Sequence, residues 1–384
     1  MNILMLTAYP PVLDMHGGGV RMYHNIRILS QKHRVRVISF IDNEDDRERL
    51  KSVREICDSV TAIRRVPDFR PHWLSVKPFL YREFRTPEMY RAVDDAFRSE
   101  RVDVLQIEYV HMAQFRRRGT FSILTALEAM SKNAWEDYSK EEAPAEKVRL
   151  FYRWMQMLRY EVLETRKFDR VVTMTAEDAA YLRSYSPGAN IRAIPIGVDI
   201  ERFKPFPEDT HRPIEVLFVG NFHHSPNIEA ASFLIRHIAP KFPGIRFVLP
   251  GPNAPANLTG GPNVFLPGFV PDIRDVYRRP NTIVMAPLFS WSGQRVKMLE
   301  AFAMGCPVVT TPVGAMGFPI RHGEEAMLAN SPGEFLEALG SLVSSVEYRR
   351  QLGERGRRMV VEKFSWDSLA EDFLSVVEEA AVSD

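Results

Sequence analysis

The chain has 384 residues, and with Lys+Arg 50 and Asp+Glu 49 its formal charge is +1. A single hydrophobic core rarely grows beyond about 250–300 residues, so this length predicts two domains. The near-neutral charge excludes an overall field that draws the protein to nucleic acid. Two cysteines far apart in sequence exclude a disulfide scaffold and a cysteine-based zinc site.

The chain begins with MNILMLTAYPP, which has no basic stretch before its short apolar run. This pattern favours a first β-strand over a signal peptide. Nowhere do about 18 apolar residues run together, so we expect no transmembrane helix. The expected location is the cytoplasm, with contact at the inner face of the membrane as the alternative.

Short runs rich in Val, Ile and Leu alternate with longer segments of helical spacing. The predicted strands are 3–6, 35–40, 60–63, 104–107, 122–124, 171–174, 192–194, 215–219, 246–249, 264–266, 282–286, 307–310 and 326–329. Helical spacing of apolar residues marks 19–31, 228–238 and 296–304. This alternation predicts an α/β protein with doubly wound parallel sheets and helices on both faces.

The predicted domain boundary is the segment 201–215, which holds three prolines and mixed charge. We therefore expect an N-terminal domain over 1–205 and a C-terminal domain over 206–364. The amphipathic segment 365–381 begins at a plausible N-cap, Ser365, and no strand follows it. It is free to pack against either domain.

A glycine run, Gly17-Gly18-Gly19, follows the first predicted strand and precedes a helical segment. Glycines allow the backbone to approach a ligand closely, and a helix N-terminus carries unpaired N–H groups with partial positive charge. This geometry suits a diphosphate. The run does not match the dinucleotide-binding pattern G-x-G-x-x-G. A flexible loop that leads into a helix remains the alternative.

The second candidate lies in WSGQRVKMLEAFAMGCPVVTTPVGAMG, residues 291–317. A glycine loop leads into a helix whose first turns hold Gln294, Arg295, Lys297 and Glu300. Basic side chains and free N–H groups at a helix start hold phosphate oxygens, and a carboxylate accepts hydrogen bonds from two ribose hydroxyls. The alternative is an ordinary amphipathic helix with a solvated charged face.

Together these segments resemble the retaining GT-B glycosyltransferases of family four, also called glycosyltransferase group 1. The resemblance rests on motifs spread over nearly the whole chain. They are 168–172 and 194–199 with Phe203 in the first half, and 219–221, 225–227, 249–251, 266–270 with Asp272, 297–301 and 305–309 in the second half.

The resemblance implies two Rossmann-like domains that face each other across a cleft, an acceptor domain followed by a donor domain. It implies transfer of a sugar from a nucleoside-diphosphate donor such as a UDP or GDP sugar, with retention and without a metal or other cofactor. It assigns the diphosphate to Lys297 and Arg295 with backbone N–H groups of Gly18, Gly19, Gly293 and Gln294. Glu300 matches the ribose-binding residue, and Phe269 with Val270 would flank the base. The segment 365–384 is implied to return to the first domain.

Three departures from the family pattern bear on the site. Ser292 stands where the family often has a glutamate that touches the donor sugar. In the second domain, Gly220 follows the first predicted strand. The loop after it reads Asn221-Phe222-His223-His224-Ser225 and lacks the basic pair that is common in the family. His223 or His224 takes part of that role, or the two are ordinary surface histidines.

The third departure lies at the end of the strand 104–107, where the family often carries a histidine near the reacting sugar. Here Glu108 takes the matching position, and His111 follows one turn later. Either side chain would orient an acceptor hydroxyl or stabilise a developing oxocarbenium ion. The alternative for Glu108 is that it caps the following helix.

Two stretches, 64–84 and 148–170, interleave arginines with aromatic residues. One interpretation is a surface that rests on an anionic membrane and receives a lipid-linked acceptor. The other is a helix packed on the core, with its arginines lining a solvated face.

The sequence as a whole predicts a retaining hexosyltransferase with a glycan or lipid-linked acceptor, in the assembly of cell-surface polysaccharide, lipopolysaccharide or glycolipid. Nucleic acid is not an expected partner. Alternatives are a nucleotide-sugar epimerase or a sugar phosphorylase on the same fold, and a non-catalytic glycan- or nucleotide-binding scaffold. Intact Gly17–Gly19, Lys297 and Glu300 argue against the scaffold, which has no need of a diphosphate site.

Overall fold

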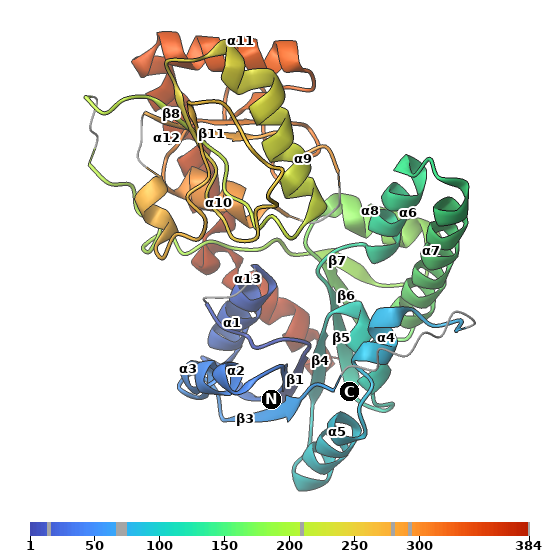
Figure 1. Cartoon of the computed structure of the whole chain (residues 1–384). Helices are drawn as coiled ribbons and strands as arrows, with labels where there is room; N and C mark the ends of the chain where they lie inside the picture. Colours follow the sequence, from blue (N-terminus) through green and yellow to red (C-terminus); the bar gives the residue numbers. More distant parts are fainter. Residues whose placement is uncertain (14–16, 67–74, 208–210, 278–280, 291–293, 383–384) are drawn as a thin grey trace. The chain divides into compact units, whose positions relative to one another are not determined.

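The structure, a computed structural model, describes residues 1–13, 17–66, 75–207, 211–277, 281–290 and 294–382. The chain divides into two compact units (Figure 1). Unit 1 comprises Met1–Ile196 with Leu369–Asp384, and unit 2 comprises Gly197–Ser368. Each unit is described by itself.

Within the described residues, unit 1 is built on seven parallel strands in the order β3-β2-β1-β4-β5-β6-β7. The strands are β1 (Asn2–Thr7), β2 (Arg34–Ile41), β3 (Ser59–Arg64), β4 (Val104–Glu108), β5 (Phe121–Ala126), β6 (Arg170–Thr173) and β7 (Ile191–Ala193). The strand order reverses between β1 and β4. In open parallel sheets, ligands bind beyond the carboxyl ends of the strands at such a reversal.

The helices of unit 1 follow the strands in sequence. They are α1 (Gly17–Leu29), α2 (Glu44–Arg49), α3 (Lys51–Arg54), α4 (Phe79–Glu83), α5 (Pro87–Ser99), η1 (Val110–Phe115), α6 (Met130–Lys140), α7 (Pro144–Thr165) and α8 (Ala176–Tyr185). Figure 1 shows α6 and α7 side by side as a helical pair. The strands β1 and β4 are buried along almost their whole length, as uninterrupted apolar runs require.

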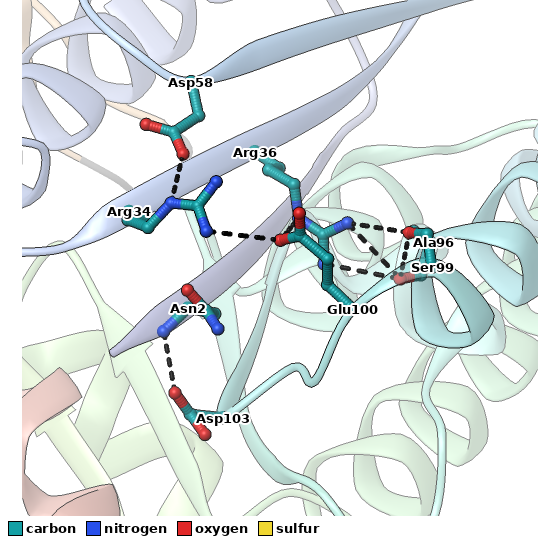
Figure 2. Close-up of polar contacts among 8 residues, drawn as sticks. All are labelled: Asn2, Arg34, Arg36, Asp58, Ala96, Ser99, Glu100 and Asp103. Atoms are coloured by element: carbon teal, nitrogen blue, oxygen red, sulfur yellow. Dashed lines mark hydrogen bonds and ion pairs between the residues drawn. The ribbon is translucent and has the colours of Figure 1, made fainter.

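Polar contacts tie together the amino-terminal ends of β1, β2 and β4 (Figure 2). The backbone N–H of Asn2 donates to Asp103 Oδ2 at 2.8 Å. Arg34 lies between two carboxylates, with Nε 2.7 Å from Asp58 Oδ2 and Nη1 3.6 Å from Glu100 Oε2. These contacts join the segments that lead into β1, β2 and β4.

Unit 2 contains six parallel strands among the residues described, in the order β10-β9-β8-β11-β12-β13. The strands are β8 (Glu215–Leu217), β9 (Arg246–Val248), β10 (Val264–Phe265), β11 (Thr282–Ala286), β12 (Val308–Thr310) and β13 (Met327–Leu328). Its helices are α9 (Ser225–Phe233), η2 (Leu234–Ile238), η3 (Ala239–Lys241), η4 (Ile273–Val276), α10 (Val296–Ala303), α11 (Pro332–Ser344) and α12 (Val346–Phe364). Here the strand order reverses between β8 and β11.

Close packing against α12 fixes the position of α10. A Cβ atom on Gly353 would lie 2.1 Å from the carbonyl oxygen of Gly305, and one on Gly356 would lie 2.6 Å from the ring of Phe302. The Arg357 guanidinium also donates to the carbonyl oxygen of Ala303, the last residue of α10. Glycines on α12 therefore let the two helices approach closely, with an arginine satisfying a helix-end carbonyl.

The loops after β8, β9 and β10 are joined by backbone hydrogen bonds. Gly220 N–H donates to Pro250 C=O at 3.1 Å, and Gly251 N–H donates to Gly268 C=O at 2.8 Å. Gly251 has a φ of 148°, and a Cβ atom there would lie 1.7 Å from Gly220 O. Only glycine fits this position, because an added side chain would overlap a backbone oxygen.

The C-terminal helix α13 (Trp366–Glu378) continues into η5 (Glu379–Val382), and from Leu369 onward it belongs to unit 1. Its Asp372 accepts from Arg192 Nη2 at 2.7 Å, and Phe373 lies under the Arg21 guanidinium at 4.9 Å. A last contact joins Glu379 to Arg170.

The α/β class with two doubly wound parallel sheets is confirmed. Each segment predicted as a strand overlaps an observed strand, and no end differs by more than two residues. Of the described helices, none is both long and apolar enough to cross a bilayer.

Candidate functional site

The predicted site residues lie at the carboxyl ends of the two sheets, in two groups. Unit 2 holds Gly220, Asn221, His223, Phe269, Val270, Gln294, Arg295, Lys297 and Glu300, and unit 1 holds Gly17, Gly18, Gly19, Glu108 and His111. Ser292 and Gly293 are outside the described residues. The unit 2 segments that follow β8 and β11 meet at the strand-order reversal.

The first turn of α10 places a cation at this reversal. Arg295 is its N-cap residue, and its Nη2 donates to the carbonyl oxygen of Ser290 at 2.8 Å. Lys297 follows within the first turn, and its Nζ lies 4.5 Å from the centroid of the Phe218 ring at the end of β8. Positive side chains therefore stand beside the unpaired N–H groups of a helix start, which is an arrangement for binding an anion.

Asn227 orients Lys297 through a hydrogen bond between two elements. Lys297 Nζ donates to Asn227 Oδ1 at 2.6 Å, and Asn227 Nδ2 donates to the carbonyl oxygen of Asn221 at 2.7 Å. Asn221 Oδ1 also accepts from Asn253 Nδ2 at 3.0 Å. The sequence did not single out Asn227 as a site residue. The available signal was its place in the Ser225-Pro226-Asn227 motif, directly after the loop that follows β8.

Glu300 lies one turn farther along α10, and Tyr277 is its partner. The Tyr277 hydroxyl donates to Glu300 Oε2 at 3.4 Å. Tyr277 is the residue directly after η4, and its side chain is buried. Glu300 itself is half-buried. A carboxylate held by one phenol keeps further lone pairs for a ligand hydroxyl. Tyr277 is a second site residue that the sequence did not reveal.

Burial shifts both ionisable groups of α10 toward neutrality. Burial, together with the neighbouring Arg295 charge and against the effect of Glu300, lowers the pKa of Lys297 to about 7. It raises the pKa of Glu300 to about 7, against the hydrogen bond from Tyr277 and the charges of Arg202 and Lys297. A desolvated cation and a desolvated anion on one helix indicate a binding site, because an anionic ligand would restore the charge of the lysine.

The two histidines after β8 differ in their surroundings. The His223 backbone N–H donates to Asn221 Oδ1 at 3.0 Å. Burial lowers the pKa of His224, and the nearby charges of His223 and Lys297 lower it further. The charge of Lys297 therefore favours the neutral form of His224 near pH 7.

Phe269 and Val270 follow β10. Phe269 is 71 % exposed, and Val270 lines a cavity of about 220 Å³ together with Leu217 and Val248 from β8 and β9. Their predicted contact with a base stays a prediction. Gln294, directly before the N-cap, is buried at 8 % exposure.

In unit 1 the three glycines form the first turn of α1, not a loop before it. Gly17 and Gly18 are half-buried and Gly19 is buried. The first four N–H groups of a helix have no partner within it, so this bare turn presents donors without side chains to obstruct them. The turn follows β1, next to the strand-order reversal of unit 1.

Glu108 lies in the interior of unit 1. Its side chain is 0 % exposed, and its Oε2 lies 3.5 Å from Nη1 of the equally buried Arg21. Its Oε1 accepts from Gln106 Nε2 at 2.6 Å and from Thr125 Oγ1 at 3.0 Å. This enclosure favours a structural role for Glu108, and its catalytic role stays a prediction. Glu108 does not cap the following helix.

His111 is also enclosed. It is 4 % exposed, its ring centroid lies 4.3 Å from that of Phe84, and burial lowers its pKa to about 3. A group with so low a pKa is a poor base near neutral pH. We therefore assign His111 to the aromatic packing behind the carboxyl ends of β1 and β4.

Over the described ranges, no three His, Cys, Asp or Glu side chains come together as a metal site. Residues 15–202 match the family model described as Glycosyltransferase Family 4, and residues 213–345 match the one described as Glycosyl transferases group 1. The chain belongs to the family-four glycosyltransferases. Members of this family use nucleotide-sugar donors, typically without a metal ion, and retain the configuration of the sugar.

Curated relatives include D-inositol 3-phosphate glycosyltransferases. The protein from Rhodococcus erythropolis is 28 % identical over 249 residues, which are 56 % of this chain and 54 % of the relative. The protein from Rhodococcus opacus is 30 % identical over 247 residues, again 56 % and 54 %. The chain thus spans about half the length of these relatives.

Solved structures show the GT-B fold over the whole chain. Sucrose-phosphate synthase from Thermosynechococcus elongatus has a TM-score of 0.75 at 16 % identity and covers 100 % of both chains. HepE of Anabaena in complex with UDP-glucose has a TM-score of 0.71 at 15 % identity, with 99 % of this chain and 100 % of that chain covered. At these identities the likeness carries the fold alone.

Proposed function

We propose that this chain transfers a hexosyl group from a nucleoside-diphosphate sugar to a glycan or lipid-linked acceptor, with retention, during assembly of cell-surface polysaccharide or glycolipid. The main support is the first turn of α10, where Lys297 is oriented by Asn227 and followed by the Glu300–Tyr277 pair. The spacing fits a nucleoside diphosphate, with phosphates at the helix start and ribose one turn later.

The proposed reaction needs a stabilised leaving group. The bond between the anomeric carbon and the diphosphate oxygen breaks, and its electron pair leaves with the diphosphate. The acceptor hydroxyl forms the new bond from the same face of the sugar, and its proton goes to the departing diphosphate oxygen. Lys297, Arg295 and the helix N–H groups are placed to bind the charge that develops on the diphosphate, which lowers the barrier.

A thermal-shift titration tests the donor site. Wild-type protein is heated in EDTA with UDP, GDP, ADP, CMP or NAD in turn, and the Glu300→Ala variant is treated alike. A nucleotide at about 100 times its Kd stabilises the folded state by about 2.7 kcal/mol, which is a readily measured rise in Tm. We expect one nucleoside diphosphate to raise the Tm of the wild type and to lose this effect in Glu300→Ala.

The matched control is Glu337→Ala, which removes an exposed glutamate from α11 in the same unit. It should respond to the nucleotide as the wild type does. A wild type that no nucleotide stabilises contradicts the transferase and favours the scaffold. Conversion of the donor sugar without any acceptor favours the epimerase, and a requirement for inorganic phosphate favours the phosphorylase.

The pKa values near 7 on α10 predict an optimum for donor binding. Above about pH 7 Lys297 loses its proton and with it the cation that binds phosphate. Below about pH 7 Glu300 gains a proton and no longer accepts two ribose hydrogen bonds. UDP-glucose, whose phosphates do not titrate in this range, should therefore bind most tightly near neutrality in calorimetric titrations.

Single variants separate the two limbs of this profile. Glu300→Gln should remove the decline in affinity below about pH 7, and Lys297→Met should remove the decline in affinity above about pH 7. A wild-type affinity that stays flat from pH 6 to 8 would show that neither group changes its charge in the free protein.

A second surface supports the proposed membrane contact. Val148, Phe151, Tyr152 and Met155 repeat at helical spacing on α7, and they are 72 %, 39 %, 42 % and 50 % exposed. We call these four residues the α7 stripe. Exposed arginines, Arg149 and Arg153, flank it. An apolar helix face bordered by basic residues suits the surface of an anionic membrane. The opposite face of α7, with Leu150, Met157 and Tyr160, packs on the core, as the alternative interpretation expects.

Vesicle cosedimentation tests the α7 stripe. We expect the protein to bind vesicles of phosphatidylcholine with phosphatidylglycerol more strongly than phosphatidylcholine alone. The double variant Phe151→Ser/Met155→Ser should bind about tenfold less tightly or weaker, because two apolar side chains are lost from the interface. Val346→Ser, at a 40 % exposed position on α12, is the control. Equal vesicle binding by Phe151→Ser/Met155→Ser and Val346→Ser would show that the α7 stripe does not contact the membrane.

A further inference from the structure

The residue after β4, Tyr109, has a backbone conformation that side chains rarely adopt. Its φ is 76° and its ψ is 137°. Its N–H donates to Thr125 C=O at 2.9 Å, and its C=O accepts from Met112 N–H at 3.0 Å, so neighbouring elements hold the conformation at both ends. A non-glycine residue in this region is strained, and such strain concentrates at functional sites.

The side chains of Glu108 and Tyr109 lie on opposite faces of the sheet, as strand alternation requires. Glu108 and Tyr109 are adjacent, yet Glu108 is 0 % exposed and paired with Arg21, whereas Tyr109 is half-buried at the carboxyl end of β4. The Tyr109 ring centroid lies 5.4 Å from that of Tyr9, which follows β1, with the planes at 78°. The two tyrosines thus flank the point between β1 and β4 where the strand order of unit 1 reverses.

A buried layer supports this pair of tyrosines. His111 stacks at 5.3 Å from Tyr109, and Phe84 contacts Tyr9 edge-on at 5.5 Å. The Arg65 guanidinium lies 4.9 Å from the Phe84 ring and binds Asp42 through two hydrogen bonds of 2.7 and 2.8 Å. Rings fixed from behind form a rigid surface that loses little entropy when a ligand binds.

A carboxylate stands beside the tyrosines. Glu128 follows β5, the next strand in the sheet, and its Oε2 accepts from Asn133 Nδ2 at 2.8 Å. Burial chiefly raises the pKa of both phenols, that of Tyr9 to about 12, and Glu128 adds to the shift after Glu83 and Asp42 at Tyr9 and after Tyr9 at Tyr109. Both hydroxyls therefore stay protonated at neutral pH.

We propose that Tyr9, Tyr109 and Glu128 form a subsite for a pyranose ring of the acceptor. A pyranose presents C–H groups on its faces and hydroxyls at its edge, which match aromatic rings beside a hydrogen-bonding carboxylate. Tyr109 is the specificity-determining residue, because its half-buried ring lies directly after β4 and contacts Tyr9. The acceptor role rests on the proposed function, whereas the sugar-binding role stands on unit 1 alone.

Saturation-transfer NMR with the full-length chain tests the subsite. The probes are the methyl glycosides of glucose, galactose and mannose at millimolar concentration. We expect wild-type protein to saturate the C–H protons of at least one glycoside, and Tyr109→Gly and Glu128→Gln to lose most of that signal. Tyr185→Ala, at a 41 % exposed tyrosine on α8, is the control and should keep it.

Melting curves of two variants test the strain separately. Tyr109→Gly and Tyr109→Ala both remove the ring, but only glycine tolerates the backbone, so the glycine variant should melt at the higher temperature. Equal melting temperatures would refute the strain argument. No glycoside signal from the wild type, or an unchanged signal from Tyr109→Gly, would overturn the subsite. A Tyr109-dependent glycoside signal without any nucleotide-induced shift would leave the subsite standing and refute the transferase.

Discussion

Replacement of Lys297 by alanine is expected to lower kcat about 10²–10³-fold, the usual effect of removing one group that binds charge developing in the transition state. The donor KM should change far less, because Arg295 and the N–H groups of the first turn of α10 still bind the ground-state diphosphate. Steady-state kinetics with the nucleotide sugar identified by thermal shift measure both constants. The fold should persist, since alanine is the best helix former.

Two further variants show whether the effect belongs to the oriented charge. Asn227→Ala removes the hydrogen bond to Lys297 Nζ but leaves the charge, so its kcat should fall less than that of Lys297→Ala. Lys363→Ala, an exposed position on α12, should behave as the wild type. Unchanged turnover in Lys297→Ala would remove this lysine from the mechanism.

Replacement of Glu108 by alanine is expected to destabilise the protein by about 3–5 kcal/mol, because it leaves the charge of Arg21 buried without its counter-ion. Burial already lowers the pKa of Arg21 despite the opposing effect of Glu108. The double variant Arg21→Met/Glu108→Leu removes both charges and should recover most of the loss. Urea unfolding followed by circular dichroism measures all three proteins.

An exposed pair supplies the comparison. Glu88 and Arg91 on α5 are 2.7 Å apart with side chains 55 % and 71 % exposed, so Glu88→Ala should change the stability by less than about 1 kcal/mol. If Glu108→Ala kept full stability and lost turnover, the carboxylate would have to act on the substrate, and the structural role assigned to it here would be refuted.

The strands were predictable because buried parallel strands are short, continuous apolar runs, and such runs stand out between polar loops. The buried position of Glu108 and its pairing with Arg21 were not predictable. A sequence shows that a carboxylate ends β4, but it does not show that the folded chain places this carboxylate beside Arg21, 87 positions earlier in the numbering. Long-range ion pairs leave no local signal.

The proposed donor side of the site was easier to predict from the sequence because most of its residues lie on one helix. Arg295, Lys297 and Glu300 fall within six consecutive positions, so their relative placement follows from helical geometry. Their partners do not: Asn227 and Tyr277 come from other elements, and only the folded chain places them at Lys297 and Glu300.

The backbone contact between Gly251 and Gly220 limits how this protein can diversify. Since no side chain fits at Gly251, this residue does not tolerate substitution while the backbone after β8 and β9 keeps its present path. Adjacent positions that face solvent, such as His223 and Phe269, carry no such restriction. If these loops bind the donor as proposed, a change of donor preference would come from such side chains and not from Gly251.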